Sequence, residues 1–222
     1  MRRNKRRVIV WGAGGHGKVT VDALLACDCW EVIGILDDDS AKGGGKILGV
    51  PVFDTTGDFS KLINELCADG IAIGIGDNYV RDKKFRYARS HGLKPVNVIH
   101  PSAHVSRFVT LGEGVTILAG ATINPGTVIE DNVCVNTAAS VDHDNHLEKN
   151  CHIFPNATLT GTVRVGQFAC VGSGAVVAPN LNLRKHSYIA AGAVVVKEVP
   201  EGVIVAGVPA IEIGQQPKRA ES

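Results

Sequence analysis

The sequence predicts a small α/β unit followed by a long β-helix, and two observations carry this prediction. Val, Ile or Leu stands at every sixth position from Ile99 to Val195. In the first 98 residues, a short apolar segment runs into a glycine-rich turn and then a helical pattern. A period of six fits neither strand alternation nor a helix, and it is typical of a parallel β-helix, in which three hexads close one coil.

The same repeat predicts which side chains fill the β-helix. Four residues after each branched position stands a second inward candidate, usually small and apolar, such as Ala121 or Ala157. Thr127 belongs to this series, and Asn145 interrupts it. Since three hexads close one coil, residues eighteen apart are expected to stack in ladders. Repeats determine architecture and not chemistry, so a purely structural solenoid stays open at this point.

The first part of the chain predicts an α/β unit that binds a nucleotide. Arg7 to Trp11 predicts a strand that runs into Gly12-Ala-Gly-Gly-His-Gly17 and then a helix with Val21, Leu24 and Leu25 on one face. Gly12, Gly14 and Gly17 fit G-x-G-x-x-G, a turn that brings backbone amides against a phosphate at a helix N-terminus.

Polar residues follow the next two predicted strands. Asp37 and Asp38 end the strand 31–36, about twenty residues after the glycines, where a carboxylate can accept from a ribose or a base. Gly76-Asp77-Asn78 follows the buried strand 71–75 and opens a further helix. Alternatively, the aspartates only cap a loop and Asp77 only caps its helix. A unit of 98 residues is too short for the six-stranded dinucleotide fold, so we expect one nucleotide and no NAD.

Composition and charge narrow the functional classes. The chain has 222 residues and a formal net charge of +1, which gives no reason to expect nucleic acid or a membrane surface as a partner. The basic cluster from Arg2 to Arg7 is interpreted as a solvated end before a strand. The apolar stretch from Val8 to Trp11 is too short for a signal peptide. We therefore expect a cytoplasmic protein.

The cysteines and histidines do not predict a metal site. The six cysteines contain no paired CxxC pattern, and Cys134, Cys151 and Cys170 are predicted to act as small hydrophobic residues in the hexads. His143, His146 and His152 resemble a metal set of the γ-class carbonic anhydrases only weakly, because the hexads place His146 and His152 on different faces. No metal is expected.

His143 is the strongest candidate for a catalytic residue. The hexads place Val141 inward, so His143 is expected to project outward at a turn, between Asp142 and Asp144. An imidazole with a pKa near 6.5 suits proton transfer at neutral pH, and a hydrogen-bonded carboxylate fixes its tautomer and raises its basicity.

The ordered combination of these motifs resembles a known family. Gly12-Ala-Gly-Gly-His-Gly17, Leu36-Asp-Asp38, the loop from Ile73 to Asn78, the hexads and Gly207-Val-Pro-Ala210 follow one another as in the PglD- and NeuD-type sugar acetyltransferases that modify bacterial nucleotide sugars. The resemblance covers nearly the whole chain. It implies a Rossmann-like nucleotide-sugar-binding domain at residues 1–98, and a left-handed β-helix acetyltransferase domain with a C-terminal tail at residues 99–222. It also implies a homotrimer that holds acetyl-CoA between subunits.

The resemblance assigns roles residue by residue. His143 matches the catalytic base and Asp144 the acidic residue after it, which is Glu in PglD. Gly14, at which the PglD branch often has Ser, belongs to the residues expected to bind the nucleotide sugar. These are Gly14, Gly15, His16, Asp37, Asp38 and Gly76. The residues expected to contact acetyl-CoA are His152, Gly161, Ser173 and Ala191.

The resulting functional hypothesis is an acetyltransferase of glycan biosynthesis. Acetyl would move from acetyl-CoA to the 4-amino group of a nucleotide-linked 4-amino-4,6-dideoxy sugar, with a UDP-sugar favoured and GDP-perosamine or a dTDP-sugar as alternatives. His143 would take the amine proton during direct attack, and amides of the Gly161 turn would stabilise the oxyanion. The alternatives are O-acetylation of sialic acid and a non-catalytic nucleotide-sugar-binding scaffold.

Overall fold

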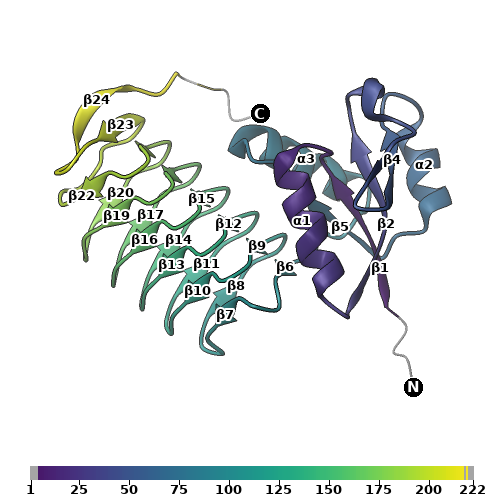
Figure 1. Ribbon diagram of the computed structural model, residues 1–222. Coiled ribbons are helices and arrows are strands. Elements are labelled where there is room, and N and C mark those ends of the chain that lie inside the picture. The colour runs from purple at the N-terminus through teal and green to yellow at the C-terminus, as the bar shows by residue number, and fades with distance from the viewer. Residues whose placement is uncertain (1–4, 218, 220–222) are drawn as a thin grey trace. The chain divides into compact units, whose positions relative to one another are not determined.

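The chain forms two compact units, Met1–Pro101 and Ser102–Ser222, which we describe separately. The computed structural model describes residues 5–217 and residue 219 (Figure 1). Arg2 and Arg3 of the predicted basic cluster, and residues 218 and 220–222 of the predicted tail, lie outside the described residues. Within the described part of the chain, no helix is long and apolar enough to cross a membrane.

The first unit is built on a five-stranded sheet with the strand order β3-β4-β2-β1-β5. All neighbours in it pair in parallel except β3 and β4. Its elements are β1 (Arg6–Trp11), α1 (Gly15–Ala26), β2 (Trp30–Asp37), the 3₁₀ helix η1 (Ser40–Lys42), β3 (Lys46–Ile47), β4 (Val50–Asp54), α2 (Phe59–Leu66), β5 (Gly70–Ile73) and α3 (Asn78–Ser90). The short strand β6 (Val98–Ile99) follows.

This unit confirms most of the predicted elements. The strands β1, β2 and β5 lie where the apolar segments predicted them, and Ile9, Leu36 and Ile71 are buried in one core cluster. The sequence did not predict β4, and the predicted helix face is wrong at Leu25, which is 46% exposed. A disulfide joins Cys27 and Cys29 between α1 and β2.

The second unit is a parallel β-helix, as the period of six predicts (Figure 1). Each coil contributes one short strand to each of three sheets, which we call walls. The first wall contains β7 (His104–Val105), β10 (Thr122–Ile123), β13 (Ser140–Val141), β16 (Thr158–Leu159), β19 (Val176–Val177) and β22 (Val194–Val195); the second contains β8 (Thr110–Leu111), β11 (Val128–Ile129), β14 (His146–Leu147), β17 (Arg164–Val165) and β20 (Asn182–Leu183). The third contains β9 (Thr116–Ile117), β12 (Cys134–Val135), β15 (His152–Ile153), β18 (Cys170–Val171) and β21 (Tyr188–Ile189), continued by β23 (Val203–Ala206) and β24 (Ile211–Gln215).

Between β7 and β22, neighbouring strands of a wall pair in parallel with an offset of eighteen residues, whereas β24 is antiparallel to β23 at the end of the third wall. Ile123 is paired with Val141, for example, and Val141 with Leu159. The branched residues of the hexads fill the axis, and from Ile117 to Ile189 they are at most 1% exposed. Cys134 and Cys151 are buried and Cys170 is half-buried. The predicted ladders are confirmed, and with them the spatial order of the turns that carry the candidate site.

Candidate functional site

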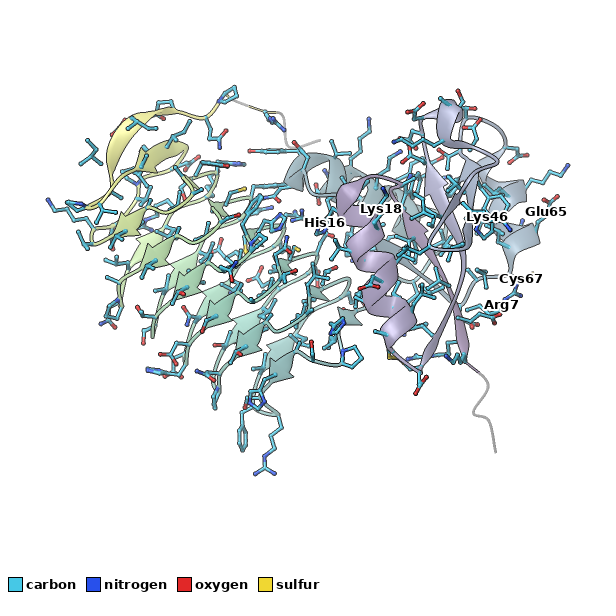
Figure 2. All side chains as sticks on the ribbon, in the orientation of Figure 1. Arg7, His16, Lys18, Lys46, Glu65 and Cys67 are labelled. Carbon is cyan, nitrogen blue, oxygen red and sulfur yellow. A yellow bond between two sulfur atoms is a disulfide. The ribbon has the colours of Figure 1, made fainter. Side chains whose placement is uncertain are left out.

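One cavity in the first unit brings together all six residues predicted to bind a nucleotide sugar. Its volume is about 310 Å³, and it lies at the carboxyl ends of β1, β2 and β5 beside the start of α1. Figure 2 labels His16 in the first turn of α1. The lining residues are Trp11, Gly12, Gly14, Gly15, His16, Asp37, Asp38, Lys42, Gly74, Ile75, Gly76, Val80 and Lys84.

The glycines of the turn differ in what they do. A Cβ at Gly17 would overlap the carbonyl oxygen of Gly12, and one at Gly12 would lie 2.6 Å from the carbonyl oxygen of Gly74. Both glycines are therefore needed for the backbone to pack. A Cβ at Gly14 or Gly15 would meet nothing within 4 Å. These two positions border open space in the cavity, so their bare backbone is available to a ligand.

The Asp37 carboxylate is held by its own chain. Its oxygens accept from the backbone N–H groups of Ala13 (2.7 Å) and Asp39 (2.9 Å) and from Lys42 Nζ (3.2 Å). Partial burial alone would raise the pKa of Asp37, but these donors outweigh it and lower the pKa below its usual value. The ionised side chain thus connects the glycine turn to the end of β2.

The Asp38 carboxylate also accepts several hydrogen bonds. Its carboxylate accepts from Trp11 Nε1 (3.2 Å) and Thr55 Oγ1 (2.7 Å) and forms an ion pair with Lys84 Nζ (2.5 Å). Burial opposes ionisation, yet the bonds from Lys84 and Thr55 lower the pKa of Asp38. Lys84 Nζ also lies 4.3 Å from the centre of the Trp11 ring. The sequence analysis missed Trp11 and Lys84; an aromatic residue directly before the first glycine of the turn is the signal that was available.

His16 and Arg81 lie at the loop after β5. Arg81 is 2% exposed, and its Nη1 donates to the carbonyl oxygens of Ile75 and Gly76 at 3.3 Å each. Burial, followed by the charge of Arg81, lowers the pKa of His16 to about 4. His16 is therefore uncharged at neutral pH, while Arg81, Lys42 and Lys84 give this region cations suited to an anionic ligand. Asp77 caps α3 by accepting from the N–H groups of Tyr79 and Val80.

The second candidate site lies on the turns between the first and second walls, which we call the His143 corner. His143 follows β13, and its Nδ1 lies 2.9 Å from Asp144 Oδ2. The neighbouring Asp142 accepts from the His143 backbone N–H (2.8 Å) and from Asn124 Nδ2 (2.8 Å). Both side chains of the His143–Asp144 pair are exposed. The carboxylate holds Nδ1, so Nε2 lies on the other side of the ring, beside Gly161.

The charges around His143 favour its protonated form. The hydrogen bond to Asp144 raises the pKa of His143 above its usual value, and the charge of Asp142 raises it further. The hydrogen bonds from Asn124 and from the His143 backbone lower the pKa of Asp142. A more basic imidazole is a stronger proton acceptor, so the arrangement suits a general base.

Two glycines bracket this pair along the β-helix axis. A Cβ at Gly161, one coil after His143, would lie 2.6 Å from its Cε1 and 2.7 Å from its Nε2. A Cβ at Gly126, one coil before Asp144, would overlap Asp144 Oδ1. Gly161 thus leaves room for the imidazole, and Gly126 for the carboxylate. The sequence analysis assigned Gly161 to the coenzyme and missed Gly126, although the ladder of eighteen residues places it directly beside Asp144.

Of the residues predicted to contact acetyl-CoA, Gly161 lies at the His143 corner, whereas Ser173, Ala191 and His152 lie elsewhere on the same chain. Ser173 and Ala191 lie on the turns between the third and first walls, which we call the Ser173 corner, where Gly192 N–H donates to the Ser173 carbonyl oxygen (2.9 Å). His143 follows a strand of the first wall, whereas Ser173 precedes one. The two corners therefore border opposite edges of the same wall.

His152 lies in the third wall and is 1% exposed. Its ring stacks on Phe154 at 4.0 Å, and its Nε2 lies 3.2 Å from Asn136 Nδ2. The Asn136 oxygen accepts from the Thr137 N–H, which assigns Nδ2 as the atom that faces the ring. This contact suits a His152 Nε2 that accepts from Asn136 Nδ2.

The remaining histidine of the predicted alternative metal set pairs with a carboxylate. His146 Nε2 lies 2.8 Å from Glu130 Oε1 on the second wall. Among the described residues, no group of three or more His, Cys, Asp or Glu could hold a metal ion. A larger cavity of about 480 Å³ also lies on the second wall, but no residue predicted for the site lines it, and its Arg164 and Lys185 are paired with Glu148 and Glu201.

A β-helix of hexapeptide repeats with an exposed His–carboxylate pair, preceded by a unit with a glycine-turn cavity, defines the class as a hexapeptide acyltransferase with a nucleotide-type domain. The PglD N-terminal domain family matches residues 7–88. The chain belongs to the PglD-type sugar acetyltransferase family, because it is 42% identical to PerB from Caulobacter crescentus over 93% of this chain and 97% of that one, with a TM-score of 0.86.

Two further relatives span nearly the whole chain. The GDP-perosamine N-acetyltransferase of Escherichia coli O157:H7 is 29% identical over 94% of this chain and 96% of its own length. The acetyltransferase domain of PglB from Neisseria gonorrhoeae FA1090, solved with acetyl coenzyme A, is 36% identical over 95% of this chain and all of that chain, with a TM-score of 0.87. The Caulobacter structure is a complex with CoA and GDP-perosamine.

We expect Gly161→Ala to displace the His143 ring. The backbone of Gly161 is not left-handed, so alanine strains nothing there except the contact with the imidazole. The acetyl-transfer kcat should fall about 10²-fold, the size of effect that a misplacement of about 1 Å has on catalysis. Gly214→Ala, where an added Cβ meets nothing within 4 Å, is the matched control. Equal kcat values for the two variants would contradict this role of Gly161.

Proposed function

We propose that this protein transfers acetyl from acetyl-CoA to the 4-amino group of a nucleotide-linked 4-amino-4,6-dideoxy sugar, with His143 as the general base. The observation that carries the proposal is the exposed His143–Asp144 pair, in which the carboxylate holds Nδ1 at 2.9 Å and leaves Nε2 as the nitrogen proposed to take the proton. Relatives that span almost the whole chain support the reaction class, since one is named a GDP-perosamine N-acetyltransferase, a second was solved with CoA and GDP-perosamine, and a third is an acetyltransferase domain solved with acetyl coenzyme A.

The proposed step needs no acyl-enzyme. The sugar amine attacks the thioester carbonyl, His143 Nε2 takes the amine proton, the C–S bond breaks, and the thiolate of CoA leaves and is protonated. The Thr162 N–H already donates to the His143 carbonyl oxygen (3.0 Å). We therefore assign the oxyanion role in this turn to the Gly161 N–H. Cys151 is buried in the axis and takes no part.

The first unit is the proposed binding site of the nucleotide. Gly14 and Gly15 leave open space at the start of α1, and Lys42 and Lys84 line the cavity and supply positive charge. An N-terminal turn of a helix beside such cations suits a diphosphate. Gly76 and His16 also line the cavity, and we propose that they contact the nucleotide sugar.

The proposed acceptor is GDP-perosamine rather than the UDP-sugar favoured from the sequence. Of two relatives matched over at least 96% of their own length, one is named a GDP-perosamine N-acetyltransferase and the other was solved in complex with GDP-perosamine. In this chain, the Asp37 and Asp38 carboxylates are the groups that would accept from the N–H groups of the base. Their present donors, Lys42 and Lys84, are flexible side chains able to turn toward a diphosphate instead.

The proposed assembly is a homotrimer of left-handed β-helices with acetyl-CoA between neighbouring chains. His143 and Ser173 border opposite edges of one wall, so a coenzyme that contacts both is easiest to place between the His143 corner of one chain and the Ser173 corner of another. Ala191 and His152 complete the coenzyme contacts proposed by resemblance. Such an enzyme would act in the cytoplasm, where acetyl-CoA and sugar nucleotides are made.

The function is tested by CoA release from acetyl-CoA with a panel of acceptors. GDP-perosamine, UDP- and dTDP-linked 4-amino-4,6-dideoxy sugars and free sialic acid are compared. We expect turnover with GDP-perosamine and a loss on the order of 10²–10⁴-fold in His143→Gln, with folding unchanged. Turnover of sialic acid alone would identify an O-acetyltransferase. No turnover of any acceptor, combined with nucleotide-sugar binding, would indicate a non-catalytic scaffold.

We expect Asp144→Asn to shift the pH profile of the reaction toward acid. The neutral imidazole is the active form, and the raised pKa of His143 places the acid limb of kcat/KM above the usual histidine value. Loss of the Asp144 charge lowers this pKa, so the acid limb moves to lower pH, while the weaker base lowers the plateau. The check is kcat/KM between pH 5 and 9. An unmoved acid limb would exclude His143 as the titrating group.

A coenzyme site between chains predicts complementation in mixed trimers. His143→Gln removes the base and Ser173→Trp fills the proposed coenzyme site, so each variant alone should be nearly inactive. In trimers reassembled from both, some interfaces pair an intact His143 with an intact Ser173, and activity should return to a substantial fraction of wild type. Each variant mixed with itself is the control. Inactive mixed trimers would place both residues in one site of one chain.

A further inference from the structure

A buried polar pair lies directly behind the His143 turn. The inward ladder that follows the His143 corner contains, coil by coil, Val109, Thr127, Asn145, Val163 and Leu181. Thr127 and Asn145 are 0% and 1% exposed. The other three positions of the ladder are apolar, which shows that the turn at this corner can form over an apolar side chain. The polar pair occurs only on the coil of His143 and on the coil before it.

Both ends of the Asn145 amide bond the backbone around His143. Its Nδ2 donates to the carbonyl oxygens of Asp142 (2.6 Å) and Thr160 (3.0 Å), with a longer contact to that of His143 (3.3 Å). Its Oδ1 accepts from the Val163 N–H (3.0 Å). One side chain thus holds both peptide groups that flank His143 and connects them to the next coil.

Thr127 acts on the same peptide from the preceding coil. Its Oγ1 donates to the Asp142 carbonyl oxygen (2.9 Å) and accepts from the Asn145 N–H (3.3 Å). The Asp142 carbonyl oxygen therefore receives two side-chain donors from inside the β-helix, while the Asp142 side chain receives the His143 N–H on the outside. The backbone of the His143 turn is fixed on both sides.

Packing of the core does not require polar side chains at Thr127 and Asn145. Buried polar groups must be hydrogen-bonded, and replacing both partners of a buried bond with apolar groups of similar shape is often neutral for stability. Valine occupies the same ladder at Val109 and Val163. What the polar pair adds is a set of directional bonds that converge on the one turn of the ladder that carries an imidazole. We propose that Thr127 and Asn145 are positioning residues, which hold the His143 turn in the geometry needed for proton transfer.

This inference rests on the proposed function, and Thr127→Val tests it. Valine has the shape of threonine without the hydroxyl, whereas Thr127→Ser keeps the hydroxyl. We expect kcat to fall about tenfold in Thr127→Val with little change in KM, because the transition state alone depends on the exact ring position. The thermal midpoint should also fall, because the buried Asn145 N–H loses its acceptor. Thr127→Ser should restore most of kcat. Leu181→Val, three coils further along the same ladder, controls for a change of core volume.

A second readout does not depend on activity. The titration of the His143 ring, followed by NMR and assigned with His143→Gln, should move toward the usual histidine pKa in Thr127→Val and in Asn145→Val, and remain unchanged in Thr127→Ser and Leu181→Val. A lower thermal midpoint with unchanged kcat and unchanged titration would show a merely structural role and overturn the proposal. A shifted titration in an enzyme that acetylates no acceptor would support the positioning role while rejecting the proposed function.

Discussion

The parallel stacking of coils eighteen residues apart is the constraint on which the rest of the second unit depends. The Asp144 N–H donates to the Pro125 carbonyl oxygen, and the Thr162 N–H to that of His143. Successive turns of the His143 corner are therefore held at about the spacing of neighbouring strands, ~4.8 Å. At that distance a side chain shares its space with the residues directly before and after it in the ladder. An imidazole fits only because its neighbour is glycine.

The same constraint explains where polar groups are tolerated inside the β-helix. The axis is dry and closely packed, so a polar side chain there must be fully bonded. Thr127 and Asn145 meet this requirement only because the turn of the corner presents its carbonyl oxygens inward beside them. The peptide group between Asp142 and His143 therefore connects the outward-facing His143 to the hydrogen bonds inside the β-helix. A regular solenoid alone has no need for such a junction.

The first unit differs from the second, because charged side chains line its cavity. The carboxylates of Asp37 and Asp38 are paired with Lys42 and Lys84. Asp37 connects the glycine turn to Lys42, and Asp38 connects Trp11 to Lys84. The carboxylates therefore build the walls of the cavity as well as line it. Arg81 holds the loop of Ile75 and Gly76 from below and keeps His16 uncharged. Backbone, carboxylate and cation together give a compact anion-accepting end to the sheet.

The sequence by itself determined the repeat, the inward residues and the glycine turn, because these follow from periodicity and local conformation. It also singled out His143 with Asp144, since the spacing placed them outward on a turn. Only the tertiary structure decided what lies beside them. Gly126, Gly161 and Thr127 contact the His143 turn from other coils. Asn145 bonds the backbone of that turn from inside the β-helix, and Lys84 reaches Asp38 from a distant helix. Contacts of this kind depend on which chain segments the fold brings within a few ångströms, and neither residue type nor local spacing records that.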